Sequence, residues 1–272
     1  MSGVNAAAGV RHTHGTIEFV TRVGVFVAAA CFSLAAQTPI VNTGQPIRVP
    51  FECTEADTVA TGITCSEEDP CPVYLELANV EAVGDKLFLT GNLHTPTNTL
   101  YSVLLATEDA GQNWNEPLAR IRASGLDQIQ FFDFQTGWIS GANLQGAPRD
   151  PFLLITTDGG KTWRQRALFE ESRVASVERF WFESRQNGAL LMDATLDNGK
   201  HELYETRTGG ESWEMRQAAE KPIKFPLNME RGPAGWRLRP DAGSHSYAVE
   251  RSQAGGWHRV ASFLVNVGAC KE

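Results

Sequence analysis

Short runs of apolar and β-branched residues, separated by polar turns, follow one another through most of the chain. A clear example is the apolar run 151–155, which is followed by an Asp-Gly-Gly turn at 158–160 and by a second strand-like run at 162–166. In such a turn the Asp carboxylate accepts hydrogen bonds from backbone N–H groups and the glycines tolerate positive φ, so the stretch is predicted to be a β-hairpin. No helical periodicity is evident between residues 72 and 265, and this predicts an all-β fold.

The hairpin motif recurs along the chain. The matching positions are Thr107, Asp109, Gly111 and Trp114 in the first copy, Thr156, Asp158, Gly160 and Trp163 in the second, and Thr206, Gly210 and Trp213 in the third. The third copy has Thr208 in place of the Asp, and a worn fourth copy ends at Trp257. The four tryptophans are separated by 49, 50 and 44 residues, a period typical of propeller blades. Because one copy tolerates loss of its Asp, the motif is predicted to fasten a hairpin rather than to react.

Two strand-like runs precede each hairpin, so each unit is predicted to hold four strands, as a propeller blade does. The predicted strands are 73–77, 86–90, 100–105 and the segment after Trp114; then 129–134, 138–141, 152–156 and 162–168; then 177–183, 189–192, 202–206 and 212–216; then 223–229, 236–239, 246–249 and 257–260. Residues 263–267 are expected to add a strand to the first unit or to the segment before it, and so to close the ring. Trp138 and Trp236 are expected to pack between blades. A fifth, irregular blade built from residues 40–70 and the carboxyl end is the alternative to four.

The repeated residues resemble the Asp-box, or bacterial neuraminidase repeat, whose pattern is Ser/Thr-x-Asp-x-Gly-x-x-Trp. The resemblance covers roughly residues 72 to 265 and implies a β-propeller whose boxes are structural hairpins away from the functional face. Such boxes occur in sialidases, in sortilin-like receptors and in proteins resembling the photosystem II assembly factor. The similarity to the last group rests on the sequence of residues 156–163 and on Phe134-Gln135-Thr136-Gly137-Trp138 before it. By analogy, that similarity favours a scaffold over an enzyme.

Residues 1–35 read as a signal peptide. Arg22 precedes an apolar run at 23–36, which is short for a membrane span of about 20 residues, and Ser33-Leu34-Ala35 suits cleavage. This predicts an extracytoplasmic protein, periplasmic or secreted, with no membrane span after the signal is removed. Two alternatives stay open: a lipoprotein acylated at Cys31, and an uncleaved anchor.

Four cysteines remain after the signal, within a lead-in at residues 36–71 and a propeller domain at 72–272. They are Cys53, Cys65, Cys71 and Cys270. An even number in an exported chain predicts two disulfides, and the economical pairing is Cys53–Cys65 with Cys71–Cys270. No second Cys pair or His pair stands at the spacing of zinc ligands, so neither a metal nor another cofactor is expected.

The charge of the chain narrows the choice of partners. Two arginines and one glutamate in residues 1–35 give +1, which takes the formal net charge of −8 for the whole chain to −9 for the rest. An acidic protein of this kind is not expected to bind nucleic acid or an anionic membrane.

Function is expected on the loop face opposite the boxes, because loops carry binding residues more often than strands do. The candidates there are His94, Arg120, Arg122, Arg149, Asp150, Glu170, Glu171 and Arg173. Each also has a structural interpretation as a loop hydrogen-bonder or a solvated ion pair. No catalytic residue is assigned, and we expect a non-enzymatic binding or assembly module for a protein or glycan. The alternative is a glycoside hydrolase, sialidase-like or with another carboxylate pair, which requires two carboxyl groups roughly 5 to 10 Å apart.

Overall fold

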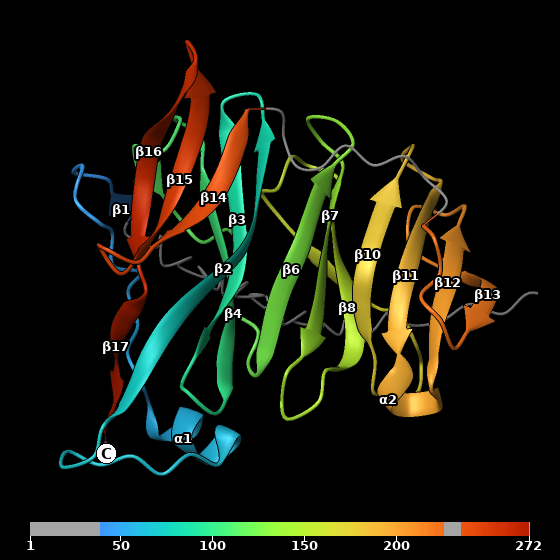
Figure 1. The fold of residues 1–272 in the computed structure, drawn as a ribbon, viewed down its shortest axis with the longest axis horizontal. Coiled ribbons are helices and arrows are strands. Elements are labelled where there is room, and N and C mark those ends of the chain that lie inside the picture. The colour runs from blue at the N-terminus through green and yellow to red at the C-terminus, as the bar shows by residue number, and fades with distance from the viewer. Residues whose placement is uncertain (1–38, 226–234, 272) are drawn as a thin grey trace, which may run out of the picture. The chain divides into compact units, whose positions relative to one another are not determined.

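The computed structural model describes residues 39–225 and 235–271 (Figure 1). Every described strand and helix belongs to one compact unit, Gln37–Glu272. The predicted signal peptide, Cys31 and residues 226–229 of one predicted strand lie outside the described residues. Within the described ranges, no helix is both long and apolar enough to cross a membrane.

The predicted all-β fold is confirmed, and two sheets have the full blade pattern of four antiparallel strands in sequence order. One sheet consists of β6 (Ser124–Phe131), β7 (Gly137–Asn143), β8 (Arg149–Thr156) and β9 (Arg164–Ala167); the next consists of β10 (Ser176–Phe182), β11 (Gly188–Ala194), β12 (Lys200–Thr206) and β13 (Glu214–Ala219). They correspond to the second and third predicted units. A short helix, α2 (Thr195–Asn198), joins β11 to β12.

The first sheet differs from the prediction in the origin of one strand. Its order is β17-β2-β3-β4, and its strands are β17 (Asn266–Cys270), β2 (Cys71–Val83), β3 (Lys86–His94) and β4 (Thr99–Thr107). After the first box, β5 (Asn113–Trp114) is only two residues long and pairs with β1 (Ile40–Val41). Pro117 follows closely and lacks the N–H that a ladder needs, which explains why no full strand forms there. The carboxyl-terminal strand completes the sheet at its other edge, beside β2.

The fourth unit has three described strands, β14 (Trp236–Asp241), β15 (Ser246–Gln253) and β16 (Gly256–Leu264). Residues 223–225, predicted to begin a further strand, are irregular. This sheet packs beside the first: the ring of Phe263 meets that of Trp114 at 5.1 Å, and Ile47 of the lead-in bridges to Phe263. Of residues 263–267, Phe263 and Leu264 end β16 and contact the lead-in, while Asn266 and Val267 belong to β17, which joins the first sheet as predicted.

A helix in the lead-in, α1 (Glu55–Thr61), was not predicted from the sequence. At its start the backbone N–H of Thr54 donates to the carboxylate of Asp57 at 2.9 Å. At its end Gly62 adopts a φ of 67°, which glycine allows at little cost. The capping residues thus define a helix too short for an apolar periodicity to be visible.

The two disulfides are present, but the predicted pairing is wrong. The bonds are Cys53–Cys270, with a sequence separation of 217, and Cys65–Cys71, with a separation of 6. Cys71 and Cys270 are opposite each other in the ladder between β2 and β17 but are not bonded to each other. The ladder already holds these strands together, while the lead-in on either side of α1 is fastened by Cys53 and Cys65.

The first two Asp boxes have the same hydrogen-bond network. In the second box the Thr156 hydroxyl donates to Asp158 at 2.8 Å and accepts from the Gly160 N–H at 3.0 Å. Asp158 also accepts from the backbone N–H of Thr162 at 3.0 Å, and the Trp163 indole donates to the Gly160 carbonyl at 3.1 Å. The corresponding bonds in the first box join Thr107, Asp109, Gly111, Asn113 and Trp114. Each carboxylate satisfies its own turn, so the predicted structural role fits the geometry.

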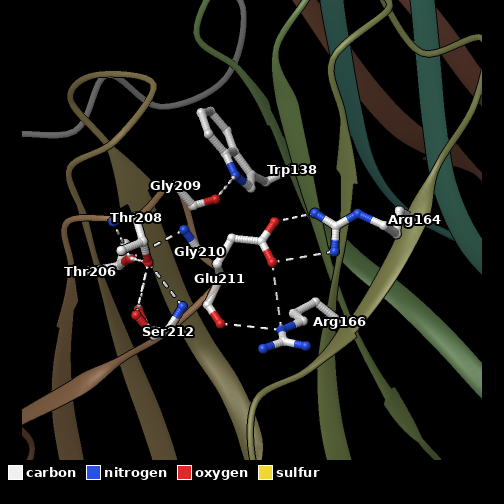
Figure 2. Close-up of polar contacts among 9 residues, drawn as sticks. All are labelled: Trp138, Arg164, Arg166, Thr206, Thr208, Gly209, Gly210, Glu211 and Ser212. Carbon is white, nitrogen blue, oxygen red and sulfur yellow. Dashed lines mark hydrogen bonds and ion pairs between the residues drawn. The ribbon is translucent and has the colours of Figure 1, made fainter. Parts of the chain in front are cut away.

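In the third box a hydroxyl takes the place of the missing carboxylate (Figure 2). Thr208 accepts from the Ser212 N–H at 3.0 Å, and Thr206 still accepts from the Gly210 N–H at 3.1 Å. The hairpin therefore survives the substitution. The box is also held from the neighbouring sheet, because the indole of Trp138 in β7 donates to the Gly209 carbonyl at 2.9 Å.

Aromatic residues of one sheet pack against the box of the next. Trp138 is fully buried between the second and third sheets, as predicted, and stacks on Phe182 of β10. In the preceding sheet, Phe88 of β3 lies so close to Gly160 that a side chain there would meet its ring at 2.5 Å. Trp236 packs on the core shared by the fourth unit and the first sheet, again as predicted. These contacts bury the apolar area that holds neighbouring sheets together.

The box carboxylates are expected to make stability depend on acid pH. Hydrogen bonds, first from Asn113, lower the pKa of Asp109 to about 2. Burial raises the pKa of Asp158, but the bonds from Thr162 and Thr156 outweigh it and bring the value to about 2. Because an unfolded Asp titrates near pH 3.9, this stabilisation is complete above about pH 5 and is lost as the pH falls towards 2.

The measurement is the thermal unfolding midpoint between pH 6 and pH 2, compared with that of the double variant Asp109→Asn, Asp158→Asn. The gap between the two proteins is expected to narrow steadily below pH 4. Glu81 also makes stability depend on pH, because burial raises its pKa to about 7. This contribution is the same in both proteins and cancels in the difference between their midpoints. A gap that stays constant down to pH 2 would contradict the assignment.

Candidate functional site

The loops opposite the boxes are joined to one another through α1. The Asn98 amide, between β3 and β4, donates to the Thr61 carbonyl at 2.8 Å. The Gln145 amide, between β7 and β8, donates to the Ala60 carbonyl at 3.1 Å. Since strands alternate in direction, these loops and the starts of β6 and β10 share one end of their sheets, here called the loop end (Figure 1).

Three of the predicted site residues lie near the first sheet, and contacts within the chain occupy them. Arg120 donates twice to the Glu116 carboxylate, at 2.8 and 2.6 Å. Arg122 contacts Asp57 of α1 at 3.2 Å and the Tyr101 hydroxyl at the same distance. The Nδ1 atom of His94 is 2.9 Å from the carbonyl oxygen of Thr95, its own neighbour.

The other five predicted residues lie around β8 and α2. Arg173 is bound to Asp197 at 2.9 Å and to the buried Glu202 at 3.0 Å, so it balances a charge inside the fold. Hydrogen bonds, above all from Glu202, raise its pKa above the usual range for arginine. Asp150, Glu170 and Glu171 line a rim pocket of about 300 Å³. Arg149 is exposed at the start of β8.

A second hollow, of about 240 Å³, opens at the loop end between the first three sheets. Its polar side chains include Glu76 from β2, Asn92 from β3 and Asp127 from β6. Its apolar wall includes Leu126 and Leu144. The hollow, called here the inner hollow, thus combines two carboxylates with an apolar surface.

The charges of the inner hollow are not balanced by the protein. Burial, and then the negative charge of Glu76, raise the pKa of Asp127. Among the described residues, no Lys, Arg or His forms an ion pair with either carboxylate, and none lines the hollow. Asn92 is 8% exposed and donates through its amide nitrogen to Glu76 at 3.2 Å. The site therefore presents hydrogen-bond acceptors that have little to accept from within the chain.

None of the eight residues predicted from the sequence lines this hollow. Glu76 lies inside a predicted strand, and its alternation with Leu75 and Leu77 placed it only on the face away from the core. Asp127 lies two residues before the predicted strand 129–134, at a register shift in β6. The register shift places Asp127 in the lining of the hollow. In the sequence, only a charged residue beside an apolar run marks this position.

In residues 39–225 and 235–271 no group of three or more His, Cys, Asp or Glu side chains has a geometry that holds a metal ion. The inner hollow contributes only two such groups.

Comparison with known proteins gives similarities of fold and of a short sequence segment. No family model matches the chain. An oligoxyloglucan-reducing end-specific xyloglucanase of Emericella nidulans is 32% identical over 68 residues, which are 24% of this chain and 8% of that protein. Among solved structures, YCF48 bound to D1 peptide is 18% identical with a TM-score of 0.39, covering 73% of this chain and 59% of its own.

Two further structures show the same kind of likeness. YCF48 from Cyanidioschyzon merolae has 13% identity and a TM-score of 0.38, covering 70% of this chain and 57% of its own. A polysaccharide lyase, PL25 ulvan lyase, has 11% identity and a TM-score of 0.37, covering 75% and 54%. The chain spans less than two thirds of each of these three solved chains and 8% of the xyloglucanase. It is thus similar to YCF48, as the Asp-box resemblance predicts, and also to proteins that act on glycans.

Proposed function

We propose that this chain is an extracytoplasmic binding or assembly module that holds a protein partner at its loop end. The observation that carries the proposal is the inner hollow, where Glu76 and Asp127 face solvent without a cation from the protein. None of the eight residues predicted from the sequence lines this hollow, and Arg120, Arg122 and Arg173 are tied to carboxylates of the chain.

The two disulfides support an extracytoplasmic location. Cys53–Cys270 and Cys65–Cys71 use every cysteine in the described residues, and disulfides persist mainly in oxidising, extracytoplasmic environments. An exported module built in this way relies on a rigid set of sheets to position its loops.

Glycoside hydrolysis is the second candidate, because Glu76 and Asp127 share one hollow and the pKa of Asp127 is raised by burial and then by Glu76. A retaining or inverting glycosidase needs such a pair. The dimensions favour binding instead: about 240 Å³ is below the roughly 300 to 1,000 Å³ typical of small-ligand pockets. The lining residues also include no aromatic ring on which a sugar can stack.

The test is selection of peptides from a displayed random library on the purified protein. Ala78 is exposed in the inner hollow, so Ala78→Phe fills the space without removing a polar group. We expect selected peptides to bind Ala78→Phe at least tenfold more weakly than the unmodified protein. The matched control is Phe134→Ser, an exposed aromatic residue at the box end, which is expected to change binding less than twofold.

A panel of neutral and acidic polysaccharides tests the second candidate, with released reducing ends as the measurement. Turnover that disappears in Asp127→Asn would replace the binding proposal by a hydrolase. Selection of peptides whose binding is lost in Phe134→Ser but kept in Ala78→Phe would move the binding surface to the box end and overturn the proposal as well.

A further inference from the structure

We infer that the inner hollow receives one cationic side chain, arginine or lysine, from the bound protein. The inference rests on the proposed function and specifies the chemistry of the site. Its basis is the combination of acceptor groups, unbalanced charge, apolar wall and small volume in one place.

Three side chains, Glu76, Asn92 and Asp127, give the hollow its acceptor groups. The ionised carboxylates of Glu76 and Asp127 have only acceptor atoms. Asn92 is fixed by its bond to Glu76: only its NH₂ can donate to a carboxylate, so its carbonyl oxygen is the group left for a ligand. In the described residues this oxygen has no hydrogen-bond partner, and it stays accessible although Asn92 as a whole is only 8% exposed. A ligand suited to this set carries several N–H donors, as guanidinium and ammonium groups do.

The contrast with other carboxylates of the chain shows what the hollow lacks. The buried Glu202 is paired with Arg173, and the buried Asp57 is paired with Arg122. Glu250, also buried, is contacted by Arg237 at 2.6 Å. In these three places an arginine balances an enclosed carboxylate, whereas the partly buried Glu81 accepts, within the described residues, only from the backbone N–H of Phe131. Glu76 and Asp127 are exposed side by side in the hollow without a cation from the described chain, and are open to one from outside.

The wall and the volume suit a side chain with an apolar stem. Leu126, Leu144 and Val177 line the hollow beside the acceptors. Arginine and lysine bury their methylene stems against apolar surface while the charged head stays with polar partners. A volume of about 240 Å³ accommodates one such side chain rather than a longer ligand.

The experiment titrates the full protein with N-acetyl-arginine amide, N-acetyl-lysine amide and N-acetyl-citrulline amide. Citrulline keeps the shape of arginine but is neutral. Binding is followed by NMR through the backbone amides of Gly125 and Asp127, both in the wall of the hollow. We expect both cationic probes to shift these amides, and citrulline to bind at least tenfold more weakly.

Two variants test the carboxylates, and a third controls for net charge. Glu76→Gln and Asp127→Asn are each expected to weaken binding of the arginine probe by about tenfold or more. Asp85→Asn removes the same charge at the exposed turn between β2 and β3, at the box end, and is expected to change binding less than twofold. Unchanged thermal midpoints establish that each variant is folded.

The inference is overturned if neither cationic probe shifts these amides, if citrulline binds as well as arginine, or if calcium ion alone saturates the site. The two experiments together distinguish failure of this inference from failure of the proposed function. Peptides that need an open hollow but show no cationic preference would remove the inference and leave the binding module. Arginine binding without any selected peptide would leave the hollow chemistry and remove the protein-binding role.

Discussion

Replacing Cys53 and Cys270 together by serine is expected to lower the free energy of unfolding by about 5 kcal/mol on the loop-entropy model. The bond joins residues separated by 217 positions, so it removes far more freedom from the unfolded chain than a local bridge does. It also fastens the lead-in to β17, the strand that completes the first sheet. The measurement is denaturant unfolding of the oxidised protein under non-reducing conditions.

The second disulfide supplies a matched control within the same molecule. Cys65–Cys71 closes a separation of only 6, and replacing both residues by serine is expected to cost about 2 kcal/mol. Equal losses from the two double variants would contradict an explanation based on loop length. They would mean that local packing around the cysteines decides the effect, since Cys65 and Cys270 are both buried.

Trp138→Ala is expected to lower the free energy of unfolding by about 3 to 5 kcal/mol, the usual cost of removing a large buried aromatic side chain. The indole has no solvent exposure, stacks on Phe182 with ring centroids 3.7 Å apart, and donates to the Gly209 carbonyl. Its removal leaves a cavity between two sheets and an unpaired carbonyl at the third box. Calorimetry or chemical denaturation measures the loss.

Trp257→Ala is the control for this variant, because Trp257 is 42% exposed at the turn into β16. Its loss is expected to stay within about 0.5 to 1 kcal/mol, even though Arg237 lies over its ring. If both tryptophan variants lost the same stability, the packing of Trp138 between the sheets would not be a main source of cohesion.

The repeated boxes made the architecture predictable, because each one places the same turn chemistry at the same distance along the chain. Asp158 with its glycines and Trp163 fixes a hairpin locally, so the strands on both sides could be assigned from short segments. The second and third sheets depend on such local signals and were predicted well. The buried position of Trp138 followed from its place after a Gly at the start of a second strand.

Features that depend on distant partners were not predictable in the same way. The pairing of Cys53 with Cys270 depends on where the lead-in runs after α1, and α1 itself is defined by caps rather than by periodicity. The shortness of the strand after Trp114 was not predicted, although the strand that joins the first sheet from the far end of the chain was expected at 263–267 and lies at 266–270.

The inner hollow was missed for a related reason. Glu76, Asn92 and Asp127 come from three strands that are brought together only by packing of the first sheet against the second. The charged loop residues Arg120, Arg122 and Arg173 were candidates instead. Each is paired with a carboxylate of the chain, and the sequence does not show these pairs: Arg120 with Glu116, Arg122 with Asp57, and Arg173 with Glu202.

The origin of β17 also sets an order for assembly during synthesis. β2 lies near the beginning of the described chain and β17 at its end, so the β2 edge of the first sheet stays unpaired until residues 266–270 have emerged. An exposed strand edge is a template for pairing with other chains. Until β17 has been made, this edge is open to pairing with other chains, and β17 removes that exposure by completing the first sheet.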